Sequence, residues 1–137
     1  MQTEPPQRVD RFDRLIGIEL TEASDVVLRG VVPVRDELKD AAGLVHGGVY
    51  AAIAETLASR GTARAVLAEG KLAVGLSSQT SFLRPIARGT IHAVATRKHR
   101  GRTTWVWQVE IFDDDRRLCA LSRMTVAVNE IAARRPR

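Results

Sequence analysis

The spacing of apolar residues changes along the chain, and it predicts one long helix set among short strands. From about Val49 to Glu69 there is no Pro, Ala is frequent, and apolar residues recur every three or four positions. So wide an apolar stripe indicates a helix that is buried along its length. Gly70 follows as the residue expected to end it. The stripe consists of Val49, Tyr50, Ile53, Ala54, Leu57 and Ala58.

Strands are predicted on both sides of the helix, where apolar and polar positions alternate. Two precede it, at 15–20 and 26–34, with a turn at Ser24 and Asp25 and with Pro33 at an edge or a strand end. Four strands follow the helix, at about 72–82, 91–95, 104–111 and 118–128. In the third of these, one face carries Trp105, Trp107, Val109 and Ile111.

This order of elements predicts an α+β fold in which one curved antiparallel sheet of about five or six strands wraps a central helix. The domain is expected over residues 15–128, between a flexible N-terminal arm at 1–14 and a basic polar tail at 129–137. The remaining face of the helix is also rather apolar. A second copy of the chain is its simplest cover, so the protein is expected to form at least a dimer.

Composition narrows the class of protein. An apolar fraction of 45% is that of a folded domain, and no apolar run is long enough to cross a bilayer. The polar first residues lack the apolar core of a signal peptide, so a cytoplasmic location without a membrane partner is expected. A lone cysteine, Cys119, excludes an internal disulfide framework, and its apolar neighbours predict that it is a buried small side chain.

Charge adds a candidate ligand class. The formal charge is +5, and Arg97, Lys98, Arg100 and Arg102 gather around one predicted turn. Such a cluster is either a solvated hairpin tip or a surface that attracts a polyanion, such as nucleic acid or the phosphates of coenzyme A. Two Trp, one Tyr and three Phe provide no aromatic platform interleaved with basic residues, which argues against single-stranded nucleic acid.

Several catalytic schemes are excluded by missing motifs. The chain has no Gly-x-Ser-x-Gly elbow, no phosphate-binding loop and no dinucleotide fingerprint. Its three histidines, His46, His92 and His99, lack the spacing of metal ligands, so no metal site is predicted.

Glu55 is the outlier of the predicted helix, because apolar residues flank it on both sides. A carboxylate in such a place is either a surface residue on a narrow polar stripe or a partly buried group used in chemistry. Partial burial would raise its pKa. Ser59 lies one turn later, where its hydroxyl can orient the carboxylate or hold water. The alternative for Ser59 is a hydroxyl that bonds back to its own helix.

His46, Gly47 and Gly48 directly precede the helix. Free N–H groups at a helix start favour an anion or a polarised carbonyl oxygen, and two glycines allow close approach. The alternative is a flexible junction. Eight residues separate Gly47 from Glu55, roughly 12 Å along a helix axis at about 1.5 Å per residue. One carbonyl group cannot contact both on one helix. If both act on one substrate, two antiparallel helices of a dimer must supply them.

Together these segments resemble the hot-dog thioesterases, most nearly the 4-hydroxybenzoyl-CoA thioesterase branch that uses a helix glutamate. The resemblance rests on Gly-Leu-Val-His-Gly-Gly at 43–48, with Glu55 eight residues after the first of the paired glycines. It continues through 80–85, 103–105 and 118–120, and spans roughly residues 15–128. It implies a hot-dog fold and hydrolysis of an aromatic acyl-CoA such as 4-hydroxybenzoyl-CoA, with no cofactor beyond the coenzyme A of the substrate. It also implies homodimers with shared active sites, assembled as a dimer of dimers.

The resemblance assigns roles to individual residues of the predicted active site. Glu55 corresponds to the catalytic carboxylate, which attacks the thioester carbon or activates water. Gly47 corresponds to the residue whose N–H polarises the thioester carbonyl, and His46 to a support for that loop rather than a base. Ser59 stands where this branch usually has Thr, so the hydroxyl is kept.

Further positions correspond to substrate contacts. Arg84 and Thr103 match positions that contact the coenzyme A nucleotide, and Arg102 lies beside them, although Arg84 also fits a simple strand-end surface charge. Asp40 departs from the Gln usual in this branch, and an ionised carboxylate there can only accept hydrogen bonds. If Asp40 faces Glu55 of the partner subunit, one of the two carboxyls is expected to have a raised pKa.

Two other functions remain open at this stage. One is a medium-chain acyl-CoA or aryl-acyl carrier thioesterase of the same fold. The other is a non-catalytic domain that binds acyl-CoA, because one fold serves many functions.

Overall fold

The computed structural model of the protein describes residues 11–131. Two helices and six strands make up the fold, together with two short 3-10 turns at Asp36–Leu38 and Leu67–Glu69. The helices are α1 (Arg11–Ile16) and α2 (Gly47–Val66). The strands are β1 (Glu19–Ala23), β2 (Val27–Pro33), β3 (Lys71–Phe82), β4 (Thr90–Arg100), β5 (Thr104–Phe112) and β6 (Leu118–Glu130).

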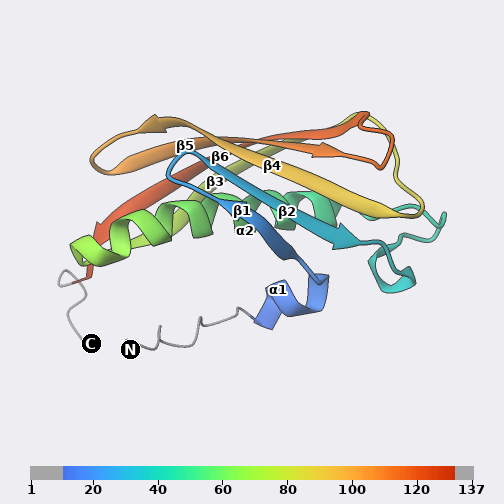
Figure 1. The fold of residues 1–137 in the computed structure, drawn as a ribbon, viewed down its shortest axis with the longest axis horizontal. Coiled ribbons are helices and arrows are strands. Elements are labelled where there is room, and N and C mark those ends of the chain that lie inside the picture. Colours follow the sequence, from blue (N-terminus) through green and yellow to red (C-terminus); the bar gives the residue numbers. More distant parts are fainter. Residues whose placement is uncertain (1–10, 132–137) are drawn as a thin grey trace.

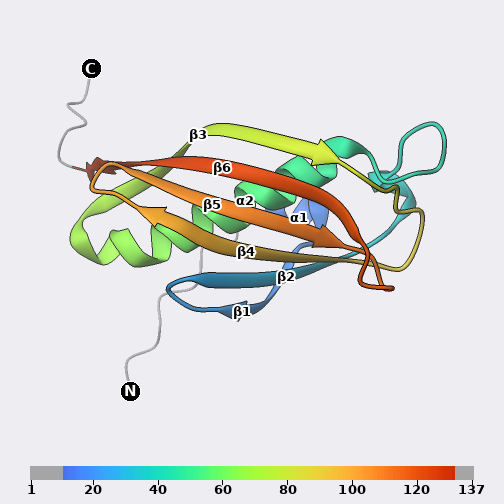
Figure 2. The ribbon, with the colours of Figure 1, turned by 90° about the horizontal axis from the view of Figure 1, so that it is seen from above.

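All six strands form one antiparallel sheet in the order β1-β2-β4-β5-β6-β3, and α2 lies along its concave side (Figure 1). The predicted arrangement of two strands, one long helix and four strands around a single core is confirmed, and the fold is the hot-dog fold. Seen from above, β1 and β3 are the two edges of the sheet (Figure 2).

The core lies between α2 and the inner face of the sheet. The four residues predicted to share one face of β5 are all buried, because every second side chain of a strand points toward the helix. Trp107 fixes the helix to the sheet. Its indole N–H donates to Thr62 Oγ1 at 2.9 Å, and the Thr62 hydroxyl donates to the Ala58 carbonyl at 2.9 Å. The helix that positions the candidate site is therefore fixed in rotation as well as in depth.

The N-terminal prediction needs correction. Residues 11–14, expected in a flexible arm, form α1 together with Leu15 and Ile16, which were expected in a strand. Phe12 and Ile16 are one turn apart, and Gly17 ends the helix with a φ of 83° that favours glycine. The N–H groups of Gly17 and Ile18 both donate to the carbonyl of Asp13. The first strand consequently starts later, at Glu19.

α1 also changes the prediction for the helix face that was expected to need a second chain. Part of that face of α2 is covered by α1 of the same chain, which lies on the side of α2 away from the sheet (Figure 1). At the other end of the chain, Asn129 and Glu130 continue β6 rather than belonging to the tail. The arm at 1–10 and the tail from 132 lie outside the described residues. No helix among residues 11–131 is long and apolar enough to cross a membrane.

Candidate active site

The first turn of α2 presents an unpaired backbone donor. His46 is the N-cap of the helix, and its Nδ1 accepts the N–H of Gly48 at 2.8 Å. The Gly47 N–H has no hydrogen-bond partner among residues 11–131, so it is available to a ligand. Nδ1 of His46 is therefore occupied as an acceptor, and the side chain caps the start of α2.

The wall beside this turn is aromatic and apolar. A methyl group on Gly47 would lie 3.0 Å from the ring of Phe82, whose own centroid is 6.2 Å from that of Tyr50. Burial raises the pKa of Tyr50 to about 12, so its phenol stays protonated near neutral pH. Burial likewise raises the pKa of the Cys119 thiol. Cys119 is fully buried, as predicted, and is not an available nucleophile.

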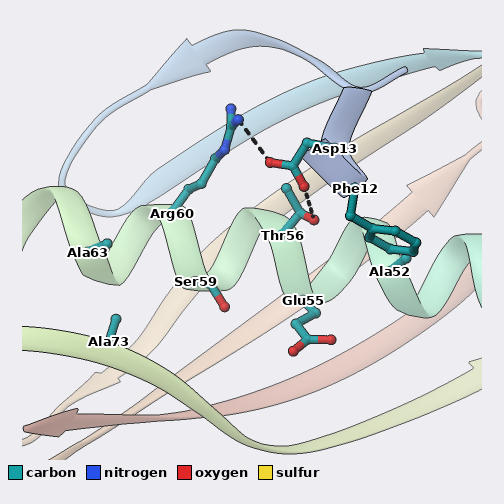
Figure 3. A pocket seen from close by; sticks show the side chains of 9 residues that line it. All are labelled: Phe12, Asp13, Ala52, Glu55, Thr56, Ser59, Arg60, Ala63 and Ala73. Carbon is teal, nitrogen blue, oxygen red and sulfur yellow. Dashed lines mark hydrogen bonds and ion pairs between the residues drawn. The ribbon is translucent and has the colours of Figure 1, made fainter. Parts of the chain in front are cut away.

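Glu55 lies in the middle of α2 and points toward β3 (Figure 3). In this single chain it is exposed, which is the first of the two alternatives that its place in the helix left open. Its carboxylate reaches the strand where Gly75 leaves room, because Oε1 is 3.2 Å from the position that a Cβ of Gly75 would take. Gly75 begins a bulge in the pairing of β3 with β6, which was not predicted from the sequence.

Glu55 and Ser59 line the same cavity of about 380 Å³, as the spacing of one helical turn predicts. No hydrogen bond joins them in the described part of the chain. The cavity runs from Ala73 on β3, across α2, to Phe12 and Asp13 on α1 (Figure 3). It therefore brings a carboxylate, a hydroxyl and an aromatic ring into one cavity.

Asp13 holds α1 against the cavity and was not singled out in the sequence. It is 4% exposed, its Oδ2 lies 2.9 Å from the Arg60 guanidinium, and its Oδ1 accepts the Thr56 hydroxyl at 2.9 Å. A buried carboxylate needs such partners. The available signal was the apolar pair Phe12 and Ile16 at helical spacing before a glycine, which predicts a short amphipathic helix.

The proposed coenzyme A contacts lie at opposite ends of the sheet. The Arg84 N–H donates to the carbonyl of Cys119, whereas the Thr103 carbonyl accepts the N–H of Val128. Cys119 and Val128 are nine residues apart on β6, roughly 30 Å at about 3.3 Å per residue. Arg84, Arg102 and Thr103 are all exposed. Because their partners on β6 are so far apart, Arg84 is distant from Arg102 and Thr103 within one chain.

The basic cluster at the predicted turn is partly held by internal contacts. The guanidinium groups of Arg97 and Arg100 lie over the ring of Trp105, with 5.3 Å and 4.7 Å to the ring centroid. Arg100 also contacts Glu69 at 3.4 Å. These two residues stabilise the β4–β5 hairpin, whereas Arg102 at its tip stays exposed.

Asp40 shapes the loop before the helix. Its Oδ1 accepts the N–H groups of Ala42 and Leu44, at 2.9 Å and 3.1 Å. Carboxylates in this arrangement stabilise tight turns. Elsewhere among residues 11–131, no group of three His, Cys, Asp or Glu side chains is placed to hold a metal ion.

Comparison with known proteins places this geometry in context. Residues 42–120 match the family model described as the thioesterase superfamily. The chain is 38% identical over 126 residues to the putative esterase Rv1847 of Mycobacterium tuberculosis, covering 90% of this chain and 88% of the relative. The solved structure of that protein superposes with a TM-score of 0.84 at 35% identity, covering 91% of this chain and 98% of that one.

Two further relatives carry thioesterase names. The proofreading thioesterase EntH of Cronobacter turicensis is 34% identical over 113 residues, which is 82% of each chain. A structure of the thioesterase SAV0944 of Staphylococcus aureus superposes with a TM-score of 0.85 at 28% identity, covering 88% of this chain and 99% of that one. Variants of SAV0944 replace a Gln and a Glu by Ala, and the interval between those two positions equals that from Asp40 to Glu55 here.

Proposed function

Because this chain belongs to the thioesterase superfamily and is an enzyme of the thioester hydrolase class, we propose that it hydrolyses an aromatic acyl-CoA, such as 4-hydroxybenzoyl-CoA, to the free acid and coenzyme A. The observation that carries the proposal is the placement of Glu55. Its carboxylate lies in a cavity with Ser59, beside β3 at Gly75, which leaves room for it. In SAV0944 the Gln and the Glu that were replaced by Ala are separated by the same interval, which supports a role for Asp40 and Glu55 in the site of this chain.

The chemistry needs one donor and one carboxylate. The Gly47 N–H, at the positive end of α2, polarises the thioester carbonyl and stabilises the oxyanion that develops there. Glu55 either takes a proton from water, whose oxygen attacks the carbonyl carbon, or attacks that carbon itself to form an anhydride that water then cleaves. In both routes the carbon–sulfur bond breaks and coenzyme A leaves as a thiolate, which needs no strong acid because thiol pKa values are modest.

A two-fold related partner brings the separated groups together. In one chain Gly47 and Glu55 are roughly 12 Å apart along α2 at about 1.5 Å per residue, and Arg84 and Thr103 lie at opposite ends of β6. Antiparallel packing of two chains along β3 would set Gly47 and Arg84 of one chain beside Glu55 and Thr103 of the other. Each site of the proposed homodimer is then shared, with Arg84, Arg102 and Thr103 contacting coenzyme A. A dimer of dimers stays a prediction from the family resemblance.

β3 has the properties of the dimer edge. It is twelve residues long, pairs with β6 and with no other strand among residues 11–131, and exposes Val74, Leu76 and Phe82. A long edge with exposed apolar side chains is a template for pairing with another chain. In the same arrangement Asp40, on the loop before Gly47, would approach Glu55 of the other subunit. Asp40 would then lie beside the substrate. Its carboxylate, unlike the amide of a Gln side chain, donates a hydrogen bond only when it is protonated.

The test is steady-state hydrolysis of 4-hydroxybenzoyl-CoA beside a straight-chain acyl-CoA, with wild type, Glu55→Ala and the control Glu130→Ala. Glu130 is an exposed carboxylate at the far end of β6. Loss of the carboxylate is expected to lower kcat by about 10²–10⁴-fold, the usual contribution of a general base, whereas Glu130→Ala leaves it unchanged. Full activity of Glu55→Ala would overturn the assignment.

A second candidate substrate is an aryl group carried on an acyl carrier protein, and the name of the proofreading relative EntH favours it. The two are distinguished by presenting the same aryl group on coenzyme A and on a carrier protein. Preference for a medium-chain acyl-CoA would replace the aryl substrate while keeping the reaction. A folded wild type that binds but hydrolyses none of them would indicate a non-catalytic acyl-CoA-binding domain.

A further inference from the structure

Two cavities meet at the N-terminal helix. The first, of about 380 Å³, contains Glu55 and Ser59. The second, of about 440 Å³, passes His46 and Gly48 at the start of α2. Phe12 and Ala52 line both, so the aromatic ring and the methyl group facing it stand between them. Figure 3 shows the Phe12 ring over Ala52, next to Glu55 on the neighbouring turn.

Three side chains, Arg35, Thr56 and Arg60, hold α1, the helix that carries Phe12. Asp13, the neighbour of Phe12, is buried against Arg60 and Thr56 of α2. At the end of α1, the Arg35 guanidinium donates to the carbonyls of Leu15 and Ile16. Removing one partner of a buried ion pair is costly, because the remaining charge is left without compensation. These contacts of the buried Asp13 and of the end of α1 hold the helix at the wall of the cavity.

On the premise of the thioesterase activity proposed above, we propose that α1 is the specificity element for the acyl group, with Phe12 as the stop that sets the longest acyl chain accepted. An acyl group whose carbonyl lies at Glu55 extends into the first cavity. There the Phe12 ring provides an apolar and aromatic surface for a flat aryl group. The same ring blocks a long flexible chain from continuing into the second cavity.

Two substitutions test this geometry, one that removes side-chain volume between the cavities and one that adds it. Phe12→Ala joins the two cavities into one longer channel, which gives a straight chain room to extend and removes the surface on which an aryl ring packs. Ala52→Val narrows the passage from the α2 side without altering α1. Arg14→Ala is the matched control, because Arg14 is an exposed residue of the same helix and lines neither cavity.

The experiment measures Kd by titration calorimetry for two non-hydrolysable thioethers of coenzyme A, one with a benzyl and one with a dodecyl group. In parallel it measures kcat/KM for the corresponding acyl-CoA esters. One methylene in an apolar pocket changes discrimination by about ten-fold or more. Phe12→Ala is therefore expected to shift the dodecyl-to-benzyl affinity ratio by at least about ten-fold toward dodecyl. Ala52→Val is expected to shift the ratio the other way, and Arg14→Ala to leave it unchanged.

An equal loss of affinity for both thioethers in Phe12→Ala would mean that α1 only stabilises the fold, and would overturn the proposal. An unchanged ratio would overturn it as well, as would a wild type that binds neither thioether. Binding of the thioethers is measured without turnover, so a failure of the proposal for Phe12 can be distinguished from a failure of the thioesterase proposal. Chain-length selection that depends on Phe12, together with no hydrolysis by wild type, would contradict the thioesterase proposal and leave α1 as the selecting element.

Discussion

The two edges of the sheet are built in opposite ways. β1 is five residues long and carries Glu22, which pairs with Arg29 across the strands at 2.8 Å. β3 is more than twice as long and leaves Leu76 61% exposed. Short, charged edges resist pairing with other chains, whereas long apolar edges favour it. The difference supports the proposed pairing of two chains through β3, and Glu55 lies beside this edge.

Leu76→Lys is expected to give the largest effect. A charge in the middle of the β3 edge would oppose pairing with a second copy, while the exposed position leaves the core intact. We expect a monomer with a native circular dichroism spectrum and with activity at least about 10²-fold lower, because each site loses the donor or the carboxylate supplied by the partner. Sedimentation and turnover assays check both expectations.

The matched control is Thr21→Lys, at an exposed position in the middle of β1. It introduces the same charge at the other edge of the sheet. Mass and turnover are expected to stay those of wild type. Equal loss of assembly from both substitutions would remove the distinction between the edges.

Gly75→Ala is expected to have an intermediate effect. The added methyl group would lie 3.2 Å from the Glu55 carboxylate, so the carboxylate must move by a fraction of an ångström or more. Small displacements of a reacting group cost up to about 10²-fold in rate, so we expect kcat to fall by about 10- to 100-fold with little change in Tm. Wild-type kcat in Gly75→Ala would show that Glu55 does not need this space.

Glu22→Gln is expected to have the smallest effect. The Glu22–Arg29 pair is half exposed on both sides, and such pairs contribute less than about 1 kcal/mol to the free energy of unfolding. Denaturant unfolding should detect at most that change, with unaltered turnover. A strong tendency of this variant to form larger assemblies would instead show that charge alone protects the β1 edge.

Periodicity was sufficient to predict the helix, the later strands and the four residues that share one face of β5, because their apolar patterns are long and regular. It was insufficient at α1, where six residues offer only three apolar positions before Gly17. The role of Asp13 depends on Arg60 and Thr56, more than forty positions away, and no local pattern indicates such a contact.

In the candidate site, too, some features could be predicted from the sequence and others depend on tertiary contacts. The spacing of Gly47, Glu55 and Ser59 on one helix could be predicted, and so could the distance that forbids one carbonyl from contacting the first two. The sequence left open whether Glu55 is exposed or partly buried, because apolar residues flank it, and the structure shows that it is exposed in a single chain. The space at Gly75 depends on a bulge in β3, which the pattern of that strand does not reveal.

The most direct measurement uses mixed dimers of Glu55→Ala and Gly47→Pro subunits, purified through two different tags. Proline removes the N–H at the first helical position, where it is tolerated, and His46 before it already has an extended backbone. Gly47→Ala, which adds a Cβ at the same place but keeps the donor, is the control. If the sites are shared, each mixed dimer holds one intact site and recovers about half of the wild-type turnover, although both homodimers are impaired by about 10²-fold or more. Turnover of the mixed dimer no higher than that of the homodimers would contradict a shared site.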